Sequence, residues 1–285
     1  MRPQTIQIFL PTGDPSGIRQ AEVTTRTVRV FDVPRSELKE FAKLPESSQS
    51  GVYFLIGEGE AGNPSTLYVG ESDDVGKRLG QNDAKKDFWD RALVAVSLTN
   101  TWTKAHIHYL EFEALALAKR ADSHKIENSQ VGHRAQLPAP LHADCEEFFE
   151  TIQVLVSTLG HNFMALPISK GAVPASDLLL ISSARCEATG TYGSQGLTVF
   201  SGSTASPASA SVAHRSARSA QDQLLAQGVL TEIAGGYVFA KDHTFRTPSA
   251  AAGVVLGRTA NGWTEWANQK RVTLDALVRV SAPVA

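Results

Sequence analysis

Residues 51–57 read GVYFLIG and residues 66–72 read TLYVGES, and both stretches predict β-strands. Both are short and rich in β-branched and aromatic residues, which is typical of strands. The turn-like segment EGEAGNPS separates them, so we expect an antiparallel hairpin. Tyr53 ends the string Gly-Val-Tyr and Tyr68 opens the string Tyr-Val-Gly, so the hairpin places both tyrosines on neighbouring strands.

Length and composition indicate about two soluble domains. The chain has 285 residues, 42% of them hydrophobic, and a formal net charge of −2. Proteins that wrap nucleic acid by charge alone are usually much more basic, so any contact with nucleic acid needs a local patch. Residues 76–91 offer a small one, with five basic and three acidic side chains.

Neither a membrane span nor a disulfide framework is expected. No apolar run approaches the roughly 20 residues of a spanning helix, and the first residues lack a signal-peptide core. Cys145 and Cys186 stand alone in the sequence, which argues against a zinc site or a disulfide scaffold. We therefore expect a cytoplasmic protein, and the sequence leaves its oligomeric state open.

The remaining patterns predict an α+β protein. A strand at 91–98 follows the motif hairpin, and helical spacing of apolar residues predicts a helix from Lys104 to about Ala121. Asp144 is an expected cap for a helix that ends at Gly160. The predicted organisation is an N-terminal β-hairpin extension at 1–48, a domain at 49–135 with a small three-stranded antiparallel sheet flanked by helices, a helical linker at 136–177, and a smaller α+β domain at 178–285.

The polar residues near the hairpin suit phosphodiester cleavage. That reaction needs an activated water and stabilisation of negative charge at phosphorus. Glu111 could hold a hard divalent ion such as Mg²⁺, and Arg78 could grip a phosphate bidentately. Tyr53 could act as the base only if a nearby cation lowered its pKa from about 10. Taken singly, each residue is more often structural, and helical geometry alone leaves Glu113 as an alternative to Glu111.

Together these residues resemble the signature of the GIY-YIG nuclease family, over about residues 50–130. The resemblance implies a metal-dependent endonuclease that hydrolyses DNA, with Mg²⁺ or Mn²⁺ on Glu111 and no small-molecule cofactor. It assigns the catalytic roles, and it selects Glu111 over Glu113. The residues matched are Tyr53, Tyr68, Arg78, Glu111 and Asn128, and the expected DNA contacts are Lys77, Lys85, Lys86 and Arg91.

The chain departs from the family pattern at two positions beside the tyrosines. Asn82 stands where many members carry histidine or tyrosine, and Glu71 stands where excision-repair members carry lysine. These departures favour the alternative of a non-catalytic protein that binds nucleic acid or senses its modification. Histidines His106 and His108 show no metal-binding spacing, and we expect them at the surface.

The flanking segments resemble a bacterial subgroup of the same family that carries a C-terminal domain of unknown function. That domain is similar to small domains attached to restriction and adenine-methylase proteins, which suggests DNA repair or restriction. A regulatory role through a partner protein is a third hypothesis. Trp263 and Trp266 are expected to cap a small core, or to stack on a base if they are exposed.

Overall fold

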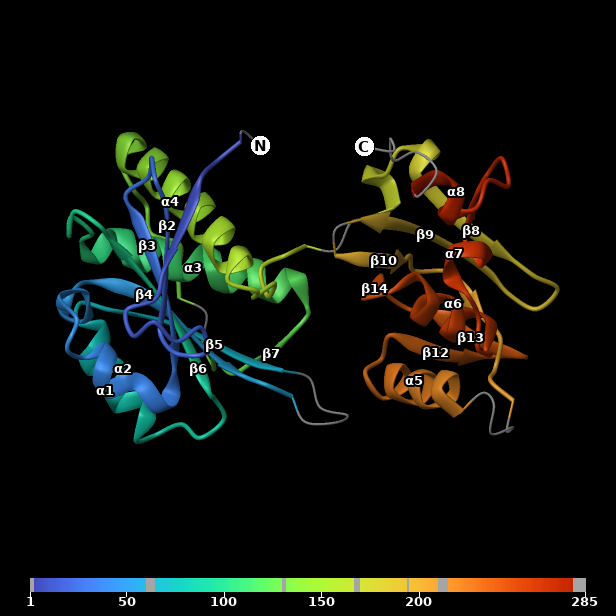
Figure 1. The fold of residues 1–285 in the computed structure, drawn as a ribbon, viewed down its shortest axis with the longest axis horizontal. Coiled ribbons are helices and arrows are strands. Elements are labelled where there is room, and N and C mark those ends of the chain that lie inside the picture. Colours follow the sequence, from blue (N-terminus) through green and yellow to red (C-terminus); the bar gives the residue numbers. More distant parts are fainter. Residues whose placement is uncertain are drawn as a thin grey trace. The chain divides into compact units, whose positions relative to one another are not determined.

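The computed structural model describes residues 3–59, 65–129, 132–166, 170–193, 195–209 and 215–278. It divides the chain into two compact units, Met1–Leu166 and Pro167–Ala285 (Figure 1). Both units combine helices with strands, which confirms the α+β class. Part of the loop between the motif strands, residues 60–64, lies outside the described residues.

A seven-stranded sheet in the order β1-β2-β3-β6-β4-β5-β7 forms the centre of the first unit. Neighbouring strands are antiparallel, except that β7 runs parallel to β5. Tyr53 lies opposite Gly70, and Leu55 lies opposite Tyr68. The strands are β1 (Ile6–Phe9), β2 (Arg19–Val23), β3 (Val28–Pro34), β4 (Gly51–Gly57), β5 (Thr66–Ser72), β6 (Arg91–Ser97) and β7 (Lys125–Ile126).

The N-terminal hairpin differs from the expected separate extension, because it continues the central sheet. Strand β3 pairs with β6 along its whole length, from Val28 opposite Ser97 to Pro34 opposite Arg91. Consecutive side chains of β3 enter the cores on the two faces of the sheet, Val30 on one face and Phe31 on the other. Because β3 also pairs with β2, and β2 with β1, the N-terminal strands extend the sheet to seven strands, where three were expected.

Helices cover both faces of this sheet (Figure 1). The helices α1 (Leu38–Phe41) and α2 (Val75–Asp83) lie on the face that buries Tyr53. The helices α3 (Lys104–Ala121) and α4 (Ala139–Thr158) lie on the face that buries Phe54. We expected α4 in a linker, yet its apolar side chains belong to the core of the first unit, as do Ile152 and Leu155. Single 3₁₀ turns at Arg35–Glu37 and Pro45–Ser48 complete the unit.

Close contact between Tyr53 and Gly70 explains the glycine of the second motif. A Cβ atom added to Gly70 would lie 2.4 Å from the hydroxyl and from Cζ of Tyr53. The tyrosine ring therefore lies directly across the neighbouring backbone, which only glycine permits. The two motifs are thus one packing unit formed by paired strands.

A buried carboxylate ties the sheet to the end of α4. Asp32 on β3 is fully buried, forms ion pairs with Arg19 and Arg91, and lies 3.5 Å from Nε2 of His161. Burial alone would raise the pKa of Asp32, but hydrogen bonds from His161, Arg91 and Arg19 outweigh it and hold this pKa below its usual value. Arg19 also donates to the carbonyl of Leu159, just after α4.

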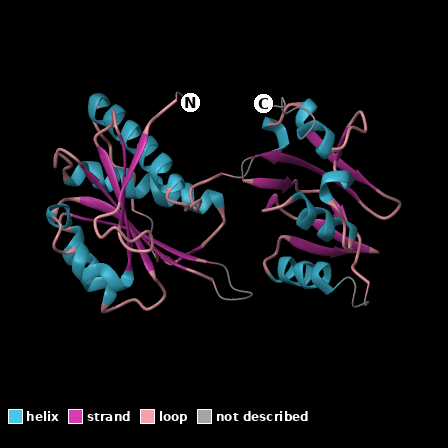
Figure 2. Cartoon of the chain, in the orientation of Figure 1, coloured by secondary structure: helices cyan, strands magenta, loops and turns pink. Residues whose placement is uncertain are grey.

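The second unit contains two antiparallel sheets, drawn in magenta with cyan helices in Figure 2. One sheet has the order β14-β10-β9-β8-β15 and the other is three-stranded, in the order β11-β13-β12. The strands are β8 (Leu178–Ser182), β9 (Glu187–Gly193), β10 (Gly196–Val199), β11 (Thr204–Ala205), β12 (Leu230–Ile233), β13 (Gly236–Phe239), β14 (His243–Phe245) and β15 (Ala267–Asn268). The helices are α5 (Arg215–Ala226), α6 (Pro248–Leu256), α7 (Gly262–Glu265) and α8 (Leu274–Val278), preceded by 3₁₀ turns at Lys170–Ala172 and Ala175–Asp177.

Trp263 and Trp266 pack in the core of the second unit, which was one of the two alternatives expected for them. Trp266 is fully buried and donates to the carbonyl of Pro248. Trp263 is half-buried and contacts the ring of Tyr192 edge-on, at 5.5 Å between centroids. Close approach of α7 to α6 requires Gly262, where a Cβ atom would lie 2.0 Å from the backbone of Pro248. A buried Trp266 cannot stack on a nucleic-acid base.

Both cysteines are free thiols in buried positions. Among the described residues, no helix combines the length and the apolar character that crossing a bilayer requires.

Replacing Gly70 by alanine should destabilise the first unit by about 1–3 kcal/mol, because the new Cβ displaces the Tyr53 ring from a filled core. Urea denaturation measures this loss. Gly80→Ala is the matched control, since Gly80 is exposed within α2 and a Cβ there meets nothing within 4 Å. That change should leave stability unchanged or raise it by up to about 1 kcal/mol. Equal effects of the two changes would contradict the packing of Tyr53 on Gly70.

The Asp32→Asn change should destabilise the protein by about 3 kcal/mol at pH 7, because it leaves two arginines beside a buried neutral group. The folded-state pKa of Asp32 is lowered, so its stabilisation is present above the unfolded value of about 3.9 and is lost as the pH falls below it. The difference between wild type and variant should therefore shrink in urea denaturation below about pH 4. Asp83→Asn, which breaks an exposed pair with Arg35, should cost less than about 1 kcal/mol.

Candidate functional site

The hydroxyl of Tyr53 is held by two donors from α2. Arg78 donates to it through Nε at 3.2 Å, and Asn82 donates through Nδ2 at 3.1 Å. The ring of Tyr68 lies 6.2 Å from the ring of Tyr53. Tyr53, Tyr68, Arg78 and Asn82 are called the tyrosine cluster below. The structure thus brings three of the five expected catalytic residues together, with Asn82 as a fourth member.

Tyr53 is a neutral phenol at physiological pH. Burial raises the pKa of Tyr53 to about 12, and the hydrogen bond from Arg78 only partly opposes this rise. The side chain is fully buried. A base of this kind needs a further cation close by before it can accept a proton from water near neutral pH.

An open pocket of ≈ 370 Å³ lies beside the tyrosine cluster, at the C-terminal end of β5. It forms where the strand turns into α2, whose first turn is capped by the side chain of Asp74 accepting from the amide of Lys77. The pocket carries both signs of charge. Its lining residues are Glu71, Ser72, Asp73, Asp74, Lys77, Arg78, Gln81 and Lys104.

A second group of polar side chains gathers where β5 meets α3. Glu71, His108 and Glu111 each offer a ligand atom, and these three atoms lie within 4.8 Å of one another. They are called the carboxylate cluster below. Burial raises the pKa of Glu111, and the charge of Glu71 raises it further, while His108, Lys104 and Arg78 oppose the shift. Arg78 therefore acts electrostatically on the carboxylate cluster while it is bonded to Tyr53.

The donors of the carboxylate cluster fit a divalent cation. Two carboxylates and one imidazole nitrogen converge, and carboxylate oxygens suit Mg²⁺ and Mn²⁺. Nδ1 of His108 lies 3.9 Å from Oε2 of Glu111. The closest cation to Glu71 is Lys104, whose ammonium group lies 2.7 Å from the carboxylate. A bound dication would relieve the repulsion between the two carboxylates.

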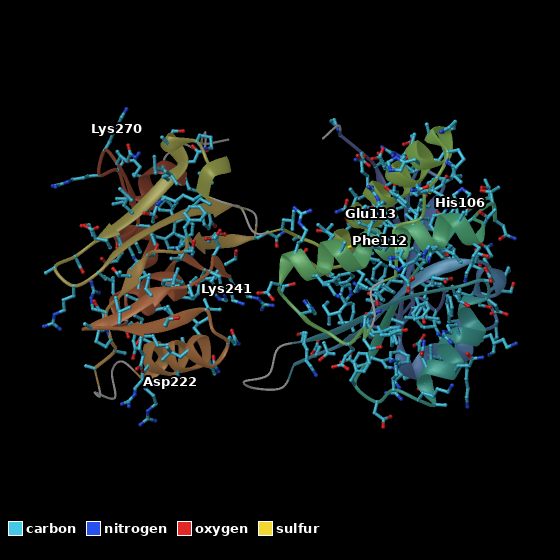
Figure 3. All side chains as sticks on the ribbon, turned by 180° about the vertical axis from the view of Figure 1, so that it is seen from behind. His106, Phe112, Glu113, Asp222, Lys241 and Lys270 are labelled. Atoms are coloured by element: carbon cyan, nitrogen blue, oxygen red, sulfur yellow. The ribbon has the colours of Figure 1, made fainter. Side chains whose placement is uncertain are left out.

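The structure separates Glu111 from the alternative acid Glu113. Glu113 forms an ion pair with Arg134, with 2.8 Å between Oε1 and Nε. Figure 3 labels Phe112 and Glu113 on α3. Since Glu113 has a basic partner and is not part of the carboxylate cluster, Glu111 is the acid that the fold places beside Glu71.

Asn128 acts on the backbone of β5. Its amide accepts from the nitrogen of Val69 at 3.0 Å and donates to the oxygen of Val69 at 2.7 Å. The side chain thereby continues the pairing of β7 along the strand that carries Tyr68. It does not join the tyrosine cluster through any described hydrogen bond.

The four expected DNA contacts lie in different settings. Lys77 lines the pocket, and the ammonium group of Lys86 lies 4.2 Å from the ring centroid of Tyr68. Lys85 is exposed. The guanidinium of Arg91 forms an ion pair with the buried Asp32, at 2.6 Å between Nη1 and Oδ1. Arg91 therefore stabilises the sheet, and this side chain is engaged within the protein.

Three residues of the two clusters were not expected as site residues. Glu71 and Asn82 were noted only as departures from the family pattern, and His108 was expected at the surface. A signal for His108 is present, because residues three apart on a helix face each other and Glu111 follows His108 by three. His106, by contrast, caps α3 by accepting from the amide of Thr103.

The comparison with known proteins concerns the second unit. Residues 179–278 match the family described as "Domain of unknown function (DUF4357)". This match confirms the expectation of a C-terminal domain of unknown function, and it covers none of the residues of either cluster. No curated protein and no solved structure matches the chain.

The Asn128→Ala change should remove both hydrogen bonds to Val69 and cost about 1–2 kcal/mol of local stability. Hydrogen exchange at the Val69 amide should accelerate accordingly. Asn128→Asp keeps an acceptor for this amide but loses the donor, so it should fall between wild type and the alanine variant. Unchanged exchange in the alanine variant would contradict the role of Asn128 in holding β5.

Proposed function

We propose that the first unit is a metal-dependent endonuclease of the GIY-YIG type that hydrolyses DNA phosphodiester bonds. The observation that carries the proposal is the position of Arg78. It bonds Tyr53 and lines the same pocket as Glu71. One cation therefore couples the tyrosine cluster to the carboxylate cluster across the end of β5, as a single phosphodiester site requires.

In this proposal each side chain has a distinct task. Glu111 holds the Mg²⁺ or Mn²⁺ ion, which when bound supplies positive charge at phosphorus and lowers the pKa of water. Arg78 keeps its Nε on Tyr53 and turns the rest of its guanidinium toward the phosphate. The ammonium group of Lys86 lies over the ring of Tyr68 in the tyrosine cluster. This cation–π contact holds a positive charge where it can contact the DNA backbone.

The mixed charge of the pocket supports the proposal that DNA binding and cleavage depend on a metal ion. Glu71, Asp73 and Asp74 line it together with three basic residues, so a phosphate meets repulsion as well as attraction. Substrate binding would then be strong only when a dication neutralises the carboxylates. This explains how a chain with a net charge of −2 can act on DNA.

One observation favours the non-catalytic alternative. Tyr53 is buried with a pKa of about 12, and its neighbour Asn82 cannot exchange a proton as histidine can. In that alternative the first unit binds DNA through the same pocket without cutting it. In either case the second unit would recognise a DNA structure or a DNA modification, in repair or restriction. The third candidate function is regulatory, with a second unit that binds a partner protein.

Wild-type protein should nick supercoiled plasmid DNA in the presence of Mg²⁺ or Mn²⁺, and the Glu111→Gln change should lower the rate by about 100-fold or more. Arg78→Lys should also lower the rate strongly, since lysine cannot bond Tyr53 and phosphate with one planar group. Glu113→Gln is the matched control, because Glu113 is on the same helix and pairs with Arg134. It should leave the rate within about threefold of wild type.

Two outcomes of this assay would decide against parts of the proposal. No cleavage of supercoiled, single-stranded or branched DNA by wild type would reject the enzyme, and binding that weakens steeply with salt would then support the non-catalytic alternative. Equal loss of cleavage in the Glu111→Gln and Glu113→Gln variants would reject the specific role of Glu111.

A further inference from the structure

The imidazole of His108 is fixed with a lone pair toward two carboxylates. Its Nε2 lies 3.1 Å from the carbonyl oxygen of His133, and a carbonyl oxygen only accepts. In the neutral ring the proton therefore sits on Nε2, and Nδ1 carries the lone pair. That Nδ1 is the atom nearest Glu111, at 3.9 Å from Oε2.

This arrangement has the features of a metal-binding histidine. Metal ligands of this type usually donate their second ring nitrogen to a carbonyl or a carboxylate, which fixes the tautomer and the ring orientation. The segment that supplies the carbonyl also packs on the ring, since a Cβ atom at Gly132 would lie 3.3 Å from Cε1 of His108. Three acceptors from Glu71, His108 and Glu111 thus face one another within 4.8 Å, which brings two carboxylates and one imidazole nitrogen within reach of a single cation.

We propose that Glu71, His108 and Glu111 are three ligands of one site for a first-row transition-metal dication. This site binds Mn²⁺ in preference to Mg²⁺. Imidazole nitrogen is a poor ligand for Mg²⁺, which favours oxygen and retains its waters, whereas Mn²⁺ and its heavier neighbours accept both donor types. This inference rests on the proposed function for the use of the metal, and it adds Glu71 and His108 to the single expected ligand Glu111.

Lys104 adds a second feature to the site. Its ammonium group lies 2.7 Å from Glu71 and 4.0 Å from Asp73, so it neutralises Glu71 in the absence of metal. The lysine side chain is 62% exposed, whereas the side chain of Glu71 is 15% exposed. A dication therefore competes with the mobile ammonium group of Lys104 for Glu71, and removal of the lysine charge should strengthen metal binding.

The test measures metal binding directly, without DNA. Mn²⁺ titrations of the full chain are followed by the electron paramagnetic resonance signal of free Mn²⁺, and Mg²⁺ is added as competitor. Wild type should bind one Mn²⁺ at least about 10-fold more tightly than Mg²⁺. His108→Gln should weaken Mn²⁺ binding by about 10- to 100-fold and Mg²⁺ binding by less than about threefold, so the preference disappears.

The other variants separate ligands from neighbours. Glu71→Gln and Glu111→Gln should weaken the binding of both ions, whereas Lys104→Gln should strengthen both by up to about fivefold. Glu113→Gln should change neither, and thermal denaturation of each metal-free variant shows whether it is folded. Opposite effects of Lys104→Gln and Glu71→Gln would not arise from a general loss of structure.

The outcomes distinguish this inference from the proposed nuclease. Mn²⁺ binding that is unaffected by Glu71→Gln and His108→Gln, or that shows no preference over Mg²⁺, overturns the three-ligand site even if the protein cuts DNA. The expected binding pattern without any DNA cleavage supports the three-ligand site and rejects the nuclease.

Discussion

The first unit depends on the contact between the ring of Tyr53 and the backbone of Gly70. Because no side chain fits at position 70, the contact favours the register in which Gly70 lies opposite Tyr53. A slip by one residue would place Val69 or Glu71 against the ring and reverse the face of every side chain on β5. The register in turn places Glu71 opposite Val52, whose side chain belongs to the core under α3.

This register distributes the polar groups over both faces of one strand end. Tyr53 and Tyr68 point toward α2, and Glu71 points toward α3, where it meets Glu111. The capped start of α2 directly after β5 returns Arg78 to the Tyr53 hydroxyl. The electrostatic link between the two clusters is therefore a consequence of strand pairing and a helix cap.

Local structure could be predicted from the sequence, and long-range pairing could not. The motif hairpin followed from strand-like composition and a turn segment, and α3 followed from helical spacing; these signals act over a few residues. The pairing of β3 with β6 joins segments about 60 residues apart, and α4 joined the core through contacts that its own pattern does not specify. In the same way, Glu111 was predicted from the family resemblance alone. Glu71 could be placed beside it only once the strand register was known, and the orientation of His108 depends on its hydrogen bond to the carbonyl of His133.

The buried phenol limits how the proposed site can handle protons. A group with a pKa of about 12 is protonated near neutral pH, and its donors Arg78 and Asn82 cannot remove that proton. Histidine at position 82 would offer a neighbour that accepts the proton, whereas asparagine only holds the oxygen in place. In the absence of substrate, the Tyr53 hydroxyl then serves to orient the guanidinium of Arg78. In the proposed nuclease, activation of water would therefore begin on the carboxylate side, where burial raises the pKa of Glu111.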